Sequence, residues 1–187
     1  MSYEVRFMGF LDKIFEKVAE KKGTAEDFEK KSEAQGKTLA DIWTIEDETD
    51  FIIALDEYVG EKCNHGDAME RLSAQERIFY ITQSLEMEVN NGGFSQYFFN
   101  SSGDFANELV AAFTEIGALS TAEICKKAVA IFGGEVPADT FDRDDVISDN
   151  EEFEEILNEC DDAFYEYPDA LTALNYEYVM KNRAFFA

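Results

Sequence analysis

The sequence has few basic residues and no long apolar run, and each scarcity excludes a class of protein. Of its 187 residues, 16 are Lys or Arg against 41 Asp or Glu, which gives a net charge of −25. Proteins that bind nucleic acid directly hold the phosphates with clustered Lys and Arg, so this composition excludes direct binding to DNA or RNA. The longest apolar runs, such as residues 51–55, fall far short of the roughly 18 residues of a membrane span.

Histidine and cysteine are also scarce. A closed zinc site needs four Cys or His ligands, and His65, the single histidine, has too few such residues around it. The three cysteines (Cys63, Cys125 and Cys160) are odd in number and lack CxxC spacing, which is typical of thiols kept in a reducing cytoplasm. Charged residues near the start do not fit a signal peptide. We therefore expect a cytoplasmic protein without a metal or cofactor.

No pattern of catalytic residues stands out either. The aspartates 142, 144 and 145 resemble the start of a calcium loop, but the positions that need Gly and Glu hold Ile147 and Phe153. There is no P-loop or dinucleotide fingerprint. Close carboxylate pairs arise by chance among so many acids and do not by themselves indicate acid–base catalysis. We expect a protein that is not an enzyme, and an enzyme with a carboxylate site remains the less favoured hypothesis.

The negative charge is unevenly distributed along the chain. Residues 1–40 hold eight basic and eight acidic side chains, whereas residues 41–187 hold 8 basic and 33 acidic ones. A step of this kind predicts a domain boundary. We expect residues 1–40 to be a charge-balanced helical N-terminal extension and residues 41–187 to be an acidic domain.

Apolar residues recur at helical spacing and strand signals are nearly absent, so we predict an all-α single domain of about seven to nine helices. The N-terminal segment is predicted to be an amphipathic helix ending at Gly23, with a second short helix from Thr24. Further along, the expected signals are an N-cap at Thr49, capping boxes of Ser73 with Glu76 and of Ser120 with Glu123, a helix break at Asn90-Asn91-Gly92-Gly93, a turn at residues 101–104, and Pro168 in the first turn of the last helix.

The predicted helix over residues 149–166 carries nine acids and no base. Its apolar positions (153, 156, 157, 160 and 164) form one stripe, so the acids must cover the other faces. Eighteen residues span roughly 27 Å, which gives one charge per about 3 Å. A single DNA strand shows one phosphate per roughly 3.4 Å. Residues 41–57, with seven acids and no base, are a candidate for the second strand.

This charge pattern predicts an acidic surface that binds a basic partner, and a plain solvated face is the competing interpretation. Like charges three and four residues apart destabilise a helix, and no lysine relieves them here, which counts against the solvated face. The predicted partner-binding residues are Asp142, Asp144, Asp145, Asp149, Glu151, Glu152, Glu155, Glu159 and Asp162.

One segment resembles a known family. Residues 88–104 read Glu88-Val-Asn-Asn-Gly-Gly-Phe-Ser-Gln-Tyr-Phe-Phe-Asn-Ser-Ser-Gly-Asp104, followed by Glu115-Ile-Gly-Ala118. They are similar, in order and spacing, to the signature of a bacterial DNA-mimic protein family that is otherwise catalogued as a domain of unknown function. The resemblance covers roughly residues 41–183. It implies an all-helical acidic domain, a dimer, whose carboxylates imitate DNA phosphates and occupy a DNA-binding protein.

The signature residues themselves are interpreted as structural. The glycines fit turns, Asn100 and Ser101 fit helix caps, and the aromatic residues fit a core. A polar binding site formed by Asn91, Gln96 and Asn100 stays open as an alternative.

The resemblance and the charge together lead to the expectation of a DNA mimic that occupies the basic surface of a cytoplasmic DNA-binding protein such as a transcriptional regulator. The alternatives are an immunity or inhibitor protein for a basic toxin or nuclease, and an acidic helical protein with no charge-based partner.

Overall fold

The computed structural model describes residues 37–186, so the two helices predicted around Gly23 and Thr24 lie outside the described residues. In the described part the chain is all-α, with no strand, which confirms the predicted fold class. None of the described helices is long and apolar enough to cross a membrane. The α-helices are α3 (Leu39–Ile42), α4 (Glu48–Lys62), α5 (Ala74–Phe99), α6 (Leu109–Glu115), α7 (Leu119–Val129), α8 (Thr140–Ser148), α9 (Glu151–Tyr165) and α10 (Leu171–Lys181).

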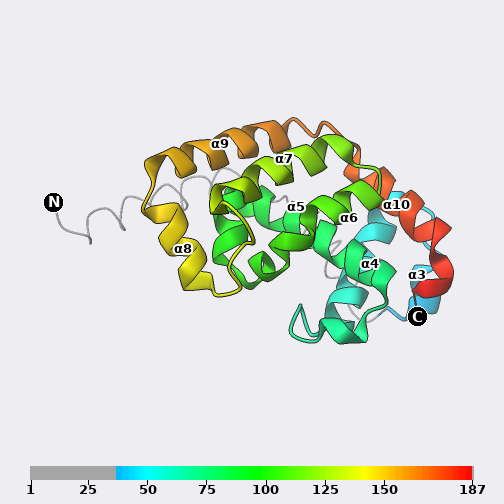
Figure 1. Ribbon diagram of the computed structural model, residues 1–187. Coiled ribbons are helices and arrows are strands. Elements are labelled where there is room, and N and C mark those ends of the chain that lie inside the picture. Colours follow the sequence, from blue (N-terminus) through cyan, green and yellow to red (C-terminus); the bar gives the residue numbers. More distant parts are fainter. Residues whose placement is uncertain (1–36, 187) are drawn as a thin grey trace.

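The long helix α5 is the centre of the domain and packs against α4, α6, α8, α9 and α10. Figure 1 shows α9 and α7 running side by side across the top, α8 at one end, and α3, α4 and α10 at the other end. Short 3-10 helices connect these elements, at Met69–Arg71, Ser101–Glu108, Ala130–Phe132 and Arg183–Phe185.

Aromatic side chains fill the interior in two clusters. The larger cluster surrounds the second half of α5, where Phe94, Tyr97 and Phe98 are fully buried. The ring of Phe94 meets that of Phe164 on α9 edge-on, with centroids 6.2 Å apart. The smaller cluster joins α3, α4 and α10 around Phe51. These contacts explain how a chain of such high negative charge still forms a packed core.

Two of the predicted N-termini are capped by residues close in sequence. The capping box of Ser73 and Glu76 is confirmed, because the Glu76 N–H donates to Ser73 Oγ at 3.1 Å and the Ser73 N–H donates to Glu76 Oε2 at 2.8 Å. The predicted cap at Thr49 is wrong: α4 begins at Glu48, and the Asp50 N–H donates to Asp47 Oδ1 at 3.0 Å. Asp47 supplies the acceptor one residue before the helix begins.

The other N-termini differ from the prediction. The capping box at Ser120 is wrong, since α7 begins at Leu119 and Asp169, from the loop before α10, takes the cap. Asp169 Oδ2 accepts from the N–H of Thr121 at 2.7 Å and from its hydroxyl at 2.9 Å. Pro168 lies in that loop, not in the first turn of α10. The expected turn at residues 101–104 is a 3-10 helix, and residues 140–148 form α8, which the apolar pattern does not predict.

Replacing Asp169 with Ala removes the cap of α7 and leaves the Thr121 N–H without this partner. We expect a loss of about 1 kcal/mol in the free energy of unfolding and a melting temperature lower by about 2–4 °C. Ser120→Ala is the control, because Ser120 is exposed and should change stability by less than about 0.5 kcal/mol. A larger loss of stability in the Ser120 variant than in the Asp169 variant would contradict the cap by Asp169 and support the local capping box of Ser120 and Glu123.

Candidate functional site

Helix α9 carries the densest group of acids and is held on the domain by one apolar face. Leu157, Cys160 and Phe164 are buried, and Phe153 and Ile156 are half-buried, so the predicted stripe is confirmed. This face packs on α5, α7 and α8. The remaining faces of α9 point to solvent.

One acid of this helix points inward. Asp161 is 4 % exposed, and its Oδ1 accepts a hydrogen bond from the Phe94 N–H at 2.7 Å. Gly93 stands beside it with φ +80° and ψ −178°, a conformation essentially restricted to glycine. A Cβ on Gly93 would lie 2.2 Å from Asp161 Oδ2. The predicted break at residues 90–93 is therefore present inside α5, and it makes room for a carboxylate from α9.

The polar signature residues surround a second buried acid. Glu88, 7 % exposed, accepts from the Gln96 amide at 2.6 Å, from the Asn100 amide at 2.8 Å and from the Ser102 hydroxyl at 3.1 Å. Gln96 and Asn100 thus use these amide hydrogens inside the domain, while Asn91 is exposed. Within residues 37–186, Asn100 gives no side-chain cap to the following 3-10 helix, so the predicted cap there is wrong.

A buried arginine positions α8. Arg143 is fully buried and forms an ion pair with Asp104 at 2.9 Å. Its guanidinium donates to the backbone oxygens of Phe98 at 2.7 Å and Asn100 at 3.1 Å, and to those of residues 137 and 138 at 2.9 and 2.8 Å. A Cβ on Gly103 would lie 2.9 Å from its Nε. Residues 135–169 carry 15 acids and one base, Arg143, and the fold encloses that base.

All nine predicted partner-binding residues are exposed, and they lie on two consecutive helices and the short connection between them. Asp149 and Asn150 connect α8 to α9, and the Asn150 side chain caps α9 by accepting from the Glu152 N–H at 3.0 Å. Figure 1 shows the two helices meeting at this corner, at one end of the molecule. We call this surface the acidic corner: Asp142, Asp144, Asp145, Asp149, Glu151, Glu152, Glu155, Glu159 and Asp162.

The charge of α9 is somewhat smaller than the sequence suggests. Lys127 on α7 lies 2.6 Å from Glu159, and the hydrogen bond from Lys127 lowers the pKa of Glu159. With Asp161 buried, the eight exposed acids of residues 149–166 and Lys127 together carry −7. Over roughly 27 Å this is one charge per about 4 Å, which is still close to a single DNA strand.

One acid of α8 has a raised pKa. Partial burial and the charge of the neighbouring Asp145 raise the pKa of Asp144. Asp142, in contrast, lies in the first turn of α8, where the helix dipole favours negative charge. The acidic corner therefore contains at least one carboxylate whose ionised form opposes folding.

The acids of residues 41–57 lie elsewhere. They belong to α3, α4 and the turn between them, and α4 packs against α3, α5 and α10. Figure 1 places α4 at the end of the molecule opposite to α8. These residues therefore do not run beside α9 as a second strand would.

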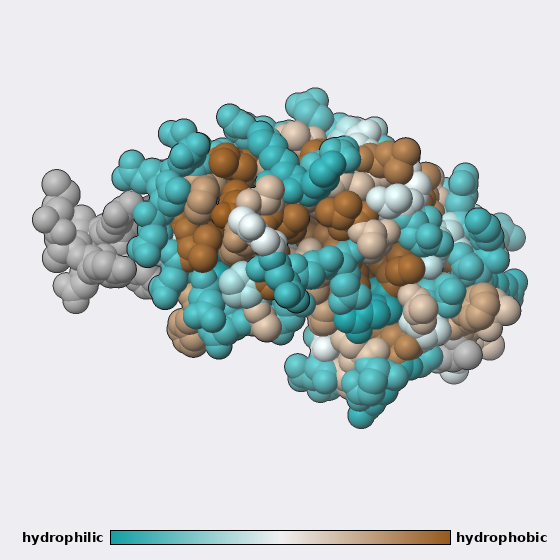
Figure 2. Space-filling view, viewed as in Figure 1, coloured by the Kyte–Doolittle hydropathy of each residue, from teal (hydrophilic) through white to brown (hydrophobic). Residues whose placement is uncertain are grey.

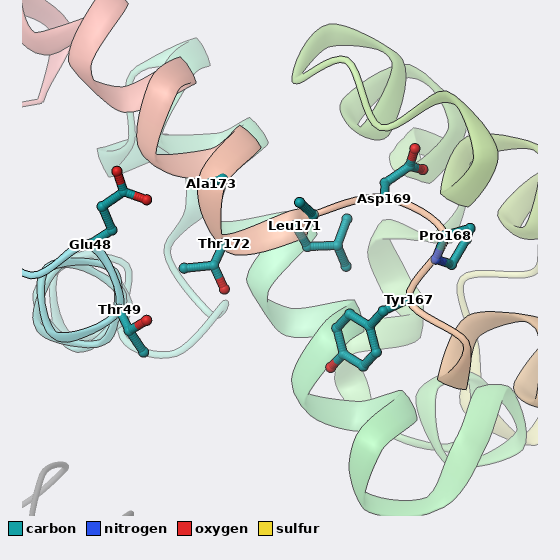
Figure 3. A pocket seen from close by; sticks show the side chains of 9 residues that line it. Glu48, Thr49, Tyr167, Pro168, Asp169, Leu171, Thr172 and Ala173 are labelled. Carbon is teal, nitrogen blue, oxygen red and sulfur yellow. The ribbon is translucent and has the colours of Figure 1, made fainter.

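A hollow of about 570 Å³ lies between the first turn of α4 and the segment from Tyr167 to Ala173. Figure 3 shows Glu48 and Thr49 on one side and the start of α10 on the other. Two of its polar side chains have partners within the domain: Asp169 caps α7, and the Tyr167 hydroxyl donates to Glu86 at 3.2 Å and accepts from Asn90 at 2.5 Å. No basic side chain is among its described lining residues, so the hollow offers an acidic ligand little attraction.

Metal-ligating side chains do not converge in the part of the chain that the structure describes: no three His, Cys, Asp or Glu residues could hold an ion together. His65 is exposed in the turn that follows α4, with a positive φ of 53°.

Replacing Gly93 with Ala strains the backbone and pushes a methyl group against the Asp161 carboxylate. We expect a loss on the order of 2–4 kcal/mol in the free energy of unfolding, measured by urea denaturation. Gly134→Ala is the matched control, because a Cβ there meets nothing within 4 Å. Equal stability of the two variants would contradict the close approach of α9 to the break in α5.

Replacing Asp144 with Asn removes a carboxylate whose pKa is raised in the folded state. An acid with a raised folded pKa destabilises the fold when it is ionised, so the variant should melt at a higher temperature than the native chain at pH 7 and low salt. The difference should vanish below the ordinary pKa of 3.8, where both states are protonated. Asp142→Asn, which removes a favourable charge at the helix start, should leave the melting temperature unchanged or lower it. A lower melting temperature for Asp144→Asn at pH 7 would contradict the raised pKa of Asp144 in the folded state.

Comparison with known proteins supports the sequence resemblance. A family model described as DMP19-like protein matches residues 70–182, which is more than half of the chain and includes α5 to α10. The match begins later than residue 41, so α3 and α4 lie outside it. No curated protein and no solved structure matches the chain. The matched residues include the signature segment, the buried carboxylates of Glu88 and Asp161, and the acidic corner. The chain therefore belongs to the DMP19-like protein family, a family of DNA mimics.

Proposed function

We propose that this protein is a DNA mimic whose acidic corner occupies the basic DNA-binding surface of another protein, such as a transcriptional regulator. The observation that carries the proposal is the near match between the spacing of exposed charge along α9, one per about 4 Å, and that of phosphates along a DNA strand. Membership of a DNA-mimic family supports the same function.

The fold presents these charges on a fixed scaffold. The apolar face of α9 and the Asp161 hydrogen bond hold one side of the helix, so the acids project from the other sides. The Lys and Arg side chains with which a partner contacts the phosphates of DNA would find carboxylates at similar spacing along α9. Binding should therefore resemble DNA binding in its steep dependence on salt.

The corresponding experiment neutralises three exposed acids of α9 in the full chain: Glu152→Gln, Glu155→Gln and Asp162→Asn. Individual exposed ion pairs contribute about 0.2–1 kcal/mol, so the triple variant should lose about 0.6–3 kcal/mol of binding free energy. The immobilised chain captures partners from native cytosol at low salt, and a salt gradient followed by duplex DNA releases them.

The control variant removes the same charge from exposed acids outside the acidic corner: Glu46→Gln, Glu61→Gln and Glu70→Gln. We expect the control to bind like the native chain and the α9 variant to release its partner at lower salt. Equal binding by both variants would place the interaction elsewhere. A captured basic nuclease that duplex DNA does not displace would favour an inhibitor or immunity protein.

A further inference from the structure

An exposed aromatic ring lies beside acids of the acidic corner. Phe141, in the first turn of α8, is 79 % exposed, more than any other large apolar side chain that the structure describes. Asp144 and Asp145 follow it by three and four residues, so they share its face of the helix. A ring so exposed adds little to the core, and it stands among the charges that we propose for the partner.

A second exposed ring belongs to the adjoining segment. Phe99, at the end of α5, is 57 % exposed. Arg143 donates to the backbone oxygens of Phe98 and Asn100, on both sides of Phe99, and also to the backbone just before α8. The same buried guanidinium therefore holds the segments that carry both rings. Figure 2 shows apolar atoms exposed at this end of the molecule, over α7 and α8, within a hydrophilic rim.

Charge alone makes a poor discriminator among DNA-binding proteins. Every such protein has a basic surface, and binding through charge falls steeply as salt rises. Apolar contacts add affinity that depends little on salt, and aromatic anchors dominate many protein interfaces. An anchor on a prearranged segment also loses little conformational entropy on binding.

We propose that Phe141, supported by Phe99, is an aromatic anchor that enters an apolar pocket beside the basic surface of the partner. The partner is then a DNA-binding protein that carries such a pocket at the edge of its Lys and Arg side chains, and the phosphate backbone of DNA has no aromatic group for that pocket. This inference rests on the proposed function and names the feature that selects one DNA-binding protein over others.

The test compares Phe141→Ala with the native chain, using the protein that duplex DNA releases from the immobilised full chain. We expect a 10- to 100-fold weaker dissociation constant at every salt concentration, with the same slope of log affinity against log salt. The α9 triple variant should instead reduce that slope. Phe185→Ala is the matched control, because Phe185 is 53 % exposed and lies in the last 3-10 helix, outside the matched family residues.

The outcomes separate the two proposals. Unchanged affinity of Phe141→Ala, together with a reduced slope for the α9 variant, overturns the aromatic anchor and leaves the DNA mimic intact. Equal losses for Phe141→Ala and Phe185→Ala also overturn the anchor. Failure to recover any protein that DNA displaces overturns both. The melting temperature of the Phe141 variant should equal that of the native chain. A loss of affinity in this variant then does not result from a loss of stability.

Discussion

The hydrogen bond between the Phe94 N–H and the Asp161 carboxylate is the contact on which the rest of the structure depends. It turns one acid of α9 inward, and with the apolar stripe it fixes which faces of that helix meet solvent. Gly93 permits the contact, because any side chain there would overlap the carboxylate. The signature glycine and the acidic surface are therefore structurally linked. The break in α5 at Gly93 makes room for Asp161 and so fixes the position of α9, the helix that carries the exposed acids.

Buried and exposed charges have separate tasks in this domain. Asp161 and Arg143 are enclosed and bonded to backbone groups of α5, so they stabilise its contacts with α9 and α8. Glu88 is bonded to side chains on the other side of the break in α5 and in the 3-10 helix that follows it. The exposed acids repel one another, and the aromatic core offsets that cost. Solubility alone does not require that the acids gather on two adjoining helices. Nor does it require that Lys127 lie at the edge of these acids and that Arg143 be buried beneath them. The separation favours a surface that meets a basic partner.

Local patterns in the sequence predict the features that depend on near neighbours. Helical spacing, the Ser73 capping box, the break at Gly92-Gly93 and the stripe of α9 all follow from residues within a turn or two. The cap of α7 by Asp169 is 48 residues away in sequence, and the burial of Asp161 depends on a backbone N–H 67 residues away, so neither has a local signal. The exposed acids of α9 are predictable from the stripe, since most polar side chains of an amphipathic helix lie opposite its apolar face, and the buried Asp161 is the exception.

The central claim is that the acidic corner is the surface that the partner covers. Carbodiimide labelling of carboxylates, followed by mass spectrometry, measures this directly in the complex with the DNA-displaceable partner. The account predicts that Glu152, Glu155 and Asp162 lose reactivity on binding, while the exposed Glu46 and Glu61 at the other end of the domain do not. Unchanged labelling of α8 and α9, with protection at α4 instead, would contradict the account.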